Sequence, residues 1–122
     1  MERTYFALDL RDDPGLIAAY ERWHRPEHIW PEVTRGLRAR GVIELELFRC
    51  GNRLLQVLRH EPVAGAQTSA AAPELSDNRL AQWERLMWQF QAPLPFAQPG
   101  EKWVPMQRIF SLEETLRVRA AL

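Results

Sequence analysis

Tyr20 and His24 are the two side chains in this 122-residue sequence whose types and spacing best suit proton transfer. They stand four residues apart, so a helix through this segment places both side chains on one face. An imidazole gains and loses a proton near neutral pH, and a neighbouring phenol can donate a hydrogen bond. The pair therefore fits acid/base chemistry, although a structural histidine packed on the same face has the same spacing.

A metal site at His24 and a catalytic role for the cysteine have less support. His28 follows His24 by four residues, a spacing that can hold a metal ion, but Pro26 disfavours the helix that would align the two rings. Cys50 is the single cysteine, which excludes an internal disulfide and a zinc site of four thiolates. Glycine-rich phosphate loops, GxSxG turns and CxxC pairs are absent from the sequence. We expect neither a metal ion nor another cofactor.

Tryptophan is unusually frequent, with five residues, and four of them fall in two short segments. Trp23 and Trp30 lie in one segment, and Trp83 and Trp88 lie in the other. Indole rings serve cores, interfaces and sugar-binding surfaces alike. Glu84 shares a helix face with Trp88, so this segment offers indoles and a carboxylate to a sugar. Packing in a core or an interface remains the simpler interpretation of the pattern.

Composition and charge indicate one globular domain. The 16 basic and 16 acidic side chains cancel, which argues against a dedicated nucleic-acid binder or a polybasic membrane protein. Neither a signal peptide nor a run of roughly 20 apolar residues occurs. We therefore expect a cytoplasmic protein with no nucleic-acid or membrane partner.

Two kinds of periodicity predict the elements that position these side chains. Alternation predicts a strand over 4–10, and turn residues followed by Pro14 then begin a helix. Apolar residues three and four apart continue to about Arg40, but Pro26 and Pro31 interrupt this pattern. We expect helices over 14–25 and 31–40, with a non-helical segment between them and Gly41 ending the second helix. A hairpin of strands over 43–48 and 53–60 is expected to follow.

The second half of the chain predicts one more helix and one more strand. Residues 62–76 suit a surface loop, and Ser76 or Asp77 then caps a helix that ends near residue 91. Residues 102–111 alternate as a strand, in which Pro105 favours an edge position or a bulge. Residues 113–122 suit a short terminal helix or tail beyond a single domain of residues 1–112. The order β-α-β-β-α-β, in the α+β class, leaves one sheet face uncovered, so we expect a homodimer.

The segments 20–24 (YERWH) and 29–33 (IWPEV) together resemble the Y-x-x-x-H…IWPE[LV] region of the L-rhamnose mutarotase family. The similarity covers nearly the whole chain up to about residue 112 and continues through Gly41, 52–55, Trp83 and 106–110. The resemblance implies a dimeric ferredoxin-like α/β barrel. It also implies a cofactor-free isomerase that interconverts the anomers of a monosaccharide.

The resemblance also implies site residues. The family's proton-donating histidine falls on His24, its substrate-binding tyrosine on Tyr20, and the first of two sugar-contacting tryptophans on Trp83. The second tryptophan is replaced by Glu84, and a further sugar-binding tyrosine is replaced by Leu45. These departures change which hydroxyls can be hydrogen-bonded. The pattern is closer to relatives that act on L-fucose, and both L-fucose and L-rhamnose stay open.

We therefore expect His24 to act as the acid/base group and Tyr20 to donate a hydrogen bond. Glu84 is expected to serve as a partner base or a hydroxyl acceptor, and Trp83 and Trp88 are expected to offer apolar surface to the sugar. The remaining tryptophans, Trp23, Trp30 and Trp103, are expected to be packing residues. Two alternatives stay open, a non-catalytic barrel that binds a small molecule and a monooxygenase of the same architecture.

Overall fold

The computed structural model describes residues 3–61 and 78–122. The predicted loop over 62–76 and its cap at Ser76 or Asp77 lie outside these residues. The elements follow one another as β1 (Arg3–Leu10), α1 (Pro14–Trp23), α2 (Pro31–Ala39), β2 (Val42–Cys50), β3 (Arg53–His60), α3 (Asn78–Trp88), β4 (Gln91–Ala92), β5 (Val104–Pro105) and α4 (Leu112–Ala121).

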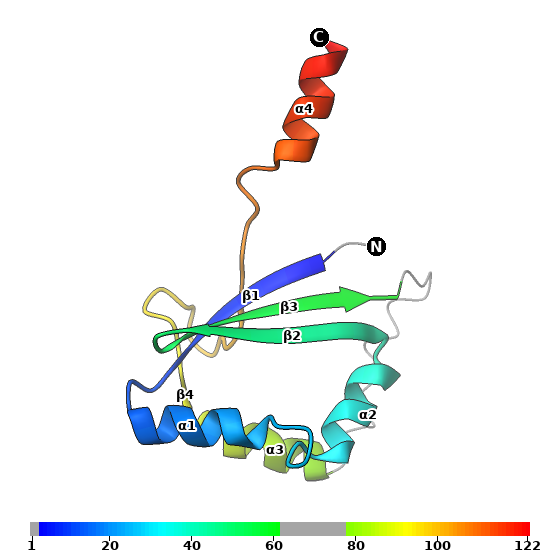
Figure 1. Cartoon of the computed structure of the whole chain (residues 1–122). Helices are drawn as coiled ribbons and strands as arrows, with labels where there is room; N and C mark the ends of the chain where they lie inside the picture. Colours follow the sequence, from blue (N-terminus) through cyan, green and yellow to red (C-terminus); the bar gives the residue numbers. More distant parts are fainter. Residues whose placement is uncertain (1–2, 62–77) are drawn as a thin grey trace.

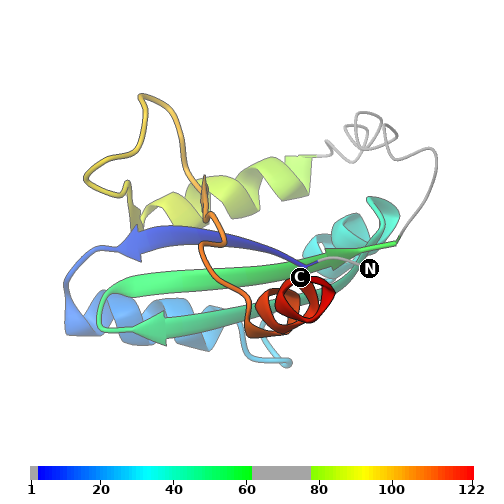
Figure 2. The ribbon, with the colours of Figure 1, turned by 90° about the horizontal axis from the view of Figure 1, so that it is seen from above.

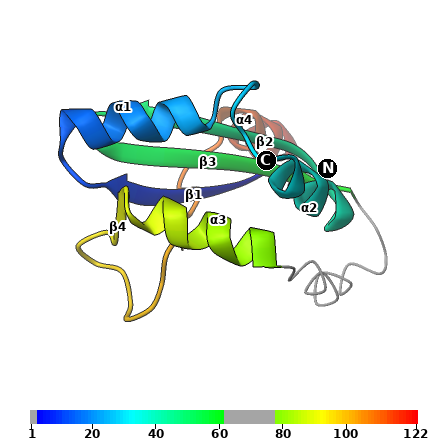
Figure 3. The same ribbon diagram turned by 90° about the horizontal axis from the view of Figure 1, so that it is seen from below.

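In the part of the chain that the structure describes, a curled antiparallel sheet combines with four helices. The strands are ordered β2-β3-β1-β4, and β5 pairs with β1 beside β4. Helices α1 and α3 lie side by side on one face of the sheet, with α2 at one end of it (Figures 1 and 3). Helix α4 lies on the opposite side and projects away from the body (Figure 1). The predicted mixture of helices and strands is confirmed.

The core lies between the sheet and the helices α1 and α3. Alternate residues of a strand point to opposite faces, so Leu8 and Leu10 share the face that is covered by helices. Leu8 pairs with Leu54 of β3, and both are buried. The main cluster of buried side chains joins both strands to both helices and consists of Leu10, Tyr20, Leu54, Trp83, Met87 and Phe90.

Local signals position helix α1 as the sequence predicts. The side chain of Asp13 accepts a hydrogen bond from the backbone N–H of Leu16 at 2.9 Å, and Pro14 occupies the first turn. The helix ends at Trp23 rather than near residue 25, which makes His24 its C-terminal cap. Turns and bends then lead to α2, as the prolines predict. This arrangement places His24 at the end of a helix, where its ring is half-buried.

The predicted strand over 102–111 is wrong in its length, because only Val104–Pro105 pairs with β1. Pro105 is opposite Phe6, and the backbone N–H of Met106 donates to the carbonyl of Tyr5 at 2.7 Å. Three residues of β1, Tyr5, Thr4 and Arg3, remain beyond this pair, but residues 106–111 form no strand and the chain leaves the sheet. A strand was also missed, since Gln91–Ala92 pairs with Asp9 and Leu10 instead of closing the helix.

No helix within residues 3–61 or 78–122 has both the length and the apolar character that a bilayer crossing needs.

Candidate active site

The imidazole of His24 is held in one tautomer by the backbone. Its Nδ1 lies 2.8 Å from the carbonyl oxygen of Tyr20, one turn earlier in α1. A carbonyl only accepts hydrogen bonds, so Nδ1 carries the proton and Nε2 of the neutral ring has a free lone pair. Burial lowers the pKa of His24 below its ordinary value of 6.5, more than the backbone hydrogen bond raises it. The ring is therefore neutral at physiological pH and suited to accept a proton through Nε2.

Tyr20 is buried beside this histidine, with 3% of its surface exposed. The rings of Tyr20 and His24 have centroids 4.4 Å apart. Gln91 donates a hydrogen bond from Nε2 to the Tyr20 hydroxyl at 3.2 Å, so the phenol keeps its own proton for another acceptor. Burial raises the pKa of Tyr20 to about 12; the Gln91 hydrogen bond opposes this rise, and the negative charge of Glu84 adds to it. Tyr20 is therefore a neutral hydrogen-bond donor.

Trp83 forms an aromatic wall on the other side of His24. The centroids of the two rings are 5.5 Å apart, in an edge-to-face arrangement. Trp23 and Trp30 contact the same indole, with centroids 6.4 and 5.2 Å from it. Trp83 is thus both a core residue and a neighbour of the predicted acid/base group. The expected packing role of Trp23 and Trp30 agrees with these contacts.

Glu84 and Trp88 meet Lys102, which comes from the segment between β4 and β5. The Lys102 ammonium lies 3.1 Å from each carboxylate oxygen of Glu84 and 4.9 Å from the centre of the Trp88 ring. Because the Glu84 charge also acts on the pKa of Tyr20, this polar group lies within electrostatic reach of the phenol. The structure thus brings Tyr20, Trp83, Glu84 and Trp88 to one region.

Two residues of this region were missed by the reasoning from sequence, Gln91 and Lys102. Gln91 follows the helix and is separated from Tyr20 by 71 positions in the chain. Its buried Oε1 has no hydrogen-bond partner within the described residues. Gln91 follows Glu84 by seven residues, so a helix continued to residue 91 would place the two side chains on one face. This spacing was the signal that could have suggested Gln91 as a site residue. The contact of Lys102 with Glu84 depends on tertiary folding and has no local signature.

Leu45 is not placed in this group by the contacts of the described residues. It lies on β2 opposite Leu58 and is half-buried. The residue of β2 that packs against the core cluster around Tyr20 is Leu47. A sugar contact at Leu45 stays a prediction.

His28 and Cys50, the other candidates from the sequence, are not gathered into a metal site within the described residues. The His28 Nδ1 is 3.1 Å from the carbonyl oxygen of Arg22, and the ring is exposed. Cys50 is exposed at the end of β2. Over residues 3–61 and 78–122, no three His, Cys, Asp or Glu side chains gather in a way that could hold a metal ion.

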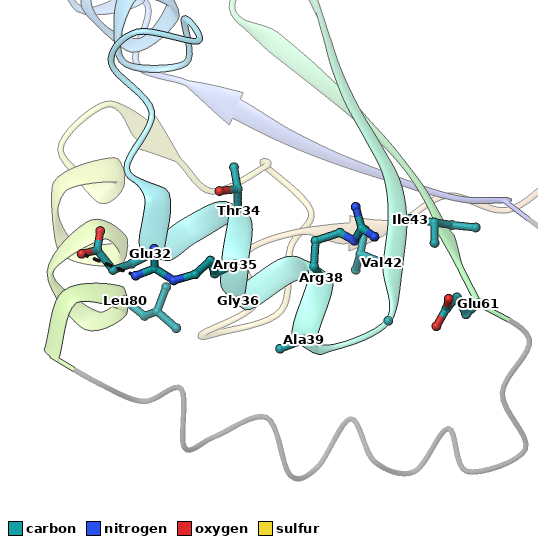
Figure 4. Close-up of a pocket in the computed structure, with 11 residues that line it drawn as sticks. Glu32, Thr34, Arg35, Gly36, Arg38, Ala39, Val42, Ile43, Glu61 and Leu80 are labelled. Carbon is teal, nitrogen blue, oxygen red and sulfur yellow. Dashed lines mark ion pairs between the residues drawn. The ribbon is translucent and has the colours of Figure 1, made fainter.

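A hollow of about 930 Å³ lies elsewhere, between α2, the start of β2 and the first turn of α3 (Figure 4). Its lining includes Glu32, Arg35 and Leu80, and none of the predicted site residues. Leu80 closes one side against Gly36, where an added Cβ would meet its side chain at 3.3 Å. Glu61 and Leu80, on its border, flank the part of the chain that the structure does not describe. The acid/base pair is therefore outside this hollow.

A comparison with protein families decides the assignment. The family model for L-rhamnose mutarotase matches residues 3–112. The chain belongs to the L-rhamnose mutarotase family. It is accordingly a sugar mutarotase, an isomerase that interconverts the anomers of a sugar. The prediction made from the Tyr20–His24 and IWPE segments is confirmed, against the alternatives of a non-catalytic barrel and a monooxygenase.

Individual members of the L-rhamnose mutarotase family match the chain over most of its length. An L-fucose mutarotase of Xanthomonas campestris pv. campestris is 46% identical, with 98% of this chain and 94% of that protein covered. An L-rhamnose mutarotase of Acidiphilium cryptum is 32% identical, with 92% and 99% covered. The crystal structure of an L-rhamnose mutarotase from Formosa agariphila superposes with a TM-score of 0.62 at 19% identity, covering 92% of this chain and 99% of that one. This structural match shows that the fold is shared.

Proposed function

We propose that this mutarotase acts on a 6-deoxy-L-hexose, L-fucose in preference to L-rhamnose, by acid/base ring opening at His24. The observation that carries the proposal is the hydrogen bond between the His24 Nδ1 and the Tyr20 carbonyl. It leaves Nε2 as a proton acceptor beside a phenol that stays protonated. The 46% identity to an L-fucose mutarotase and the replacement of a family tryptophan by Glu84 support L-fucose.

The proposed reaction moves one proton between two oxygens of the sugar. His24 Nε2 takes the proton of the anomeric hydroxyl, the C1–O5 bond breaks, and C1 becomes an aldehyde carbon. Tyr20 donates a hydrogen bond to the ring oxygen as negative charge develops on it, and the imidazolium then delivers its proton there. After rotation about C1–C2, the reverse steps close the ring on the other face of the aldehyde. A neutral histidine suits the first step, and this is the state that burial favours.

The sugar-binding roles belong to the same proposal. Trp83, which is largely buried, presents only a small part of its indole beside His24. Trp88 is half-buried and offers apolar surface to the C–H face or methyl group of the sugar. Glu84 accepts a hydrogen bond from a sugar hydroxyl, and Leu45 is the family position whose loss of a phenol alters the choice of sugar.

Anomer exchange measured by saturation-transfer NMR tests this proposal. The rates for L-fucose, L-rhamnose and D-galactose are compared in the presence of the same concentration of protein. We expect the largest acceleration for L-fucose, a smaller one for L-rhamnose and the smallest for D-galactose, which belongs to the opposite enantiomeric series and carries a hydroxyl at C6. A preference for L-rhamnose would refute the choice of sugar. No acceleration of any of the three would refute the function.

We also propose that the chain forms a homodimer of ferredoxin-like subunits through the sheet face that lies opposite α1 and α3. The pairs Tyr5↔Val57 and Phe48↔Leu55 place their side chains on this face, and Tyr5 and Phe48 are 43% and 51% exposed. The C-terminal segment lies over the same side in Figure 2. Several of its apolar side chains are exposed, namely Met106, Ile109, Phe110, Leu112, Leu116, Val118 and Leu122. Many exposed apolar side chains on one side of a chain are typical of an interface.

Sedimentation measurements test the dimer. The wild-type chain is expected to sediment as a dimer at micromolar concentration, and Phe48→Glu is expected to shift it to a monomer because a charge is costly in an apolar interface. A charge reversal on the surface away from this face, Glu27→Lys, serves as the control. A wild-type monomer at these concentrations would contradict the proposal.

Two further expectations remain part of the proposal. Residues 1–112 are taken as the catalytic domain and α4 as an addition to it, so a chain that ends at Ser111 should keep the ability to accelerate anomer exchange. The cytoplasm is taken as the compartment, where reducing conditions keep the exposed Cys50 as a free thiol.

A further inference from the structure

Lys102 is the only lysine of the chain, since the other fifteen basic residues are arginines. Its side chain is 14% exposed, although an ammonium group usually stays in water. The Glu84 side chain that it contacts is 61% exposed. The Lys102 ammonium is thus largely covered, and the carboxylate that faces it remains open to solvent.

We propose that Lys102 and Glu84 form a subsite for two neighbouring hydroxyls of the sugar, with Trp88 as its apolar base. In this subsite the ammonium donates a hydrogen bond to one hydroxyl oxygen, and the carboxylate accepts one from the adjacent hydroxyl. This inference rests on the proposed function, because it concerns the sugar that reacts at His24.

The geometry of the ion pair fits this ligand. The ammonium donates to both Glu84 oxygens, each 3.1 Å away, which leaves at least one of its three protons for a ligand. Each carboxylate oxygen also has a second lone pair. Oxygens of neighbouring gauche hydroxyls are separated by about the length of a hydrogen bond, roughly 2.8 Å. A vicinal diol can therefore bridge the ammonium and the carboxylate, which lie at a similar distance from each other.

The position of the pair relative to His24 also fits. Glu84 lies on α3 close enough for its charge to act on Tyr20, whose ring centroid is 4.4 Å from that of His24. The anomeric carbon must lie at His24, so the pair reaches hydroxyls farther along the sugar ring. At C4 the hydroxyl of L-fucose is axial, whereas that of L-rhamnose is equatorial. A subsite that holds the C3 and C4 hydroxyls therefore meets differently directed oxygens in the two sugars.

A sole lysine gives a direct test of contact. Protein labelled with ¹³C at lysine Cε has one such side-chain signal, which is followed while L-fucose is added and, in a control, 1,3-propanediol, which has no vicinal hydroxyls. We expect a saturable shift with L-fucose in the wild type and in His24→Ala, and no saturable shift with 1,3-propanediol. A sample that accelerates anomer exchange but shows no shift of this signal would overturn the subsite alone. A sample that accelerates exchange of none of the three sugars would overturn the proposed function.

Kinetics of Lys102→Met test the role of the ammonium. The Glu84 carboxylate that loses its partner is 61% exposed and stays hydrated, so the variant is expected to fold. Its KM for L-fucose should rise by about tenfold, the loss expected for one charged hydrogen bond, with kcat within about twofold of the wild type. The rise should vanish with a deoxy sugar that lacks the contacted hydroxyl, 3-deoxy-L-fucose or 4-deoxy-L-fucose.

The matched control is Arg108→Met, which breaks the exposed ion pair between Arg108 and Glu114 outside the site. This variant should leave KM and kcat unchanged. An unchanged KM in Lys102→Met, or a KM that rises equally for L-fucose and for both deoxy sugars, would overturn the subsite.

Discussion

The hydrogen bond between Tyr20 and Gln91 makes Tyr20→Phe an informative perturbation of the site. The change removes one oxygen and keeps the aromatic ring, which packs 6.2 Å from the ring of Phe90. Gln91 then loses the acceptor of its Nε2 donor while it stays buried, with 2% of its surface exposed. Its Oε1 already lacks a partner within the described residues, so the whole side-chain amide becomes unsatisfied.

The magnitude follows from this burial. A lost hydrogen bond costs about 1 kcal/mol, and a buried donor left without a partner adds about 1 kcal/mol or more. The free energy of unfolding of Tyr20→Phe should therefore fall by about 2 kcal/mol. For a chain of this size, the midpoint of thermal unfolding should fall by roughly 6–10 °C. Anomer exchange should also slow, because the phenol no longer donates to the ring oxygen.

The assay is urea and thermal unfolding of Tyr20→Phe, Gln91→Leu and the double variant. Gln91→Leu should cost less than Tyr20→Phe, because it removes the unpartnered Oε1 together with the donor. The double variant should be more stable than the sum of the two losses predicts, by about 1 kcal/mol, since neither polar group is left without the other. A Tyr20→Phe variant as stable as the wild type, or strictly additive losses, would refute this reasoning.

Two other predictions concern the pH dependence of stability, and a third concerns the turn at Gly41. Acidification below pH 6.5 should lower the free energy of unfolding, because burial lowers the pKa of His24 and the unfolded chain then binds a proton that the folded chain does not. Urea titrations should show that the stability of His24→Asn depends less on pH in this range. Stability should also fall as pH rises from 10 toward 12, since burial raises the pKa of Tyr20 to about 12, and Tyr20→Phe should lack this loss. Gly41→Ala should cost about 1 kcal/mol in denaturant unfolding, as its φ of 88° is in the left-handed region; a wild-type midpoint would contradict this.

The proximity of Tyr20 and His24 could be predicted because it depends on local rules. Tyr20 and His24 are one helical turn apart, and α1 is regular up to Trp23, so helical spacing was enough to bring the two rings together. The contact of Trp83 with His24 required tertiary packing of α3 against α1 and was not predicted, since the family resemblance gave Trp83 only a sugar-contacting role.

The parts that were missed depend on strand register and distant contacts. A strand of two residues, Gln91–Ala92, is too short to show alternation, so the position of Gln91 beside Tyr20 could not be derived from it. The alternating residues after Pro105 predicted a longer strand, but pairing with β1 stops at Pro105 and the chain leaves the sheet. Lys102 reaches Glu84 only because the segment before β5 passes α3.

The central claim is that the Nε2 of His24 carries the proton between the two oxygens of the sugar. Saturation-transfer NMR on L-fucose, with wild type and His24→Ala at equal concentrations of folded protein, tests it most directly. We predict that the variant loses at least about 100-fold of the anomer exchange rate that the wild type adds, the contribution typical of a general acid/base group. An exchange rate equal to that of the wild type in His24→Ala would contradict the account.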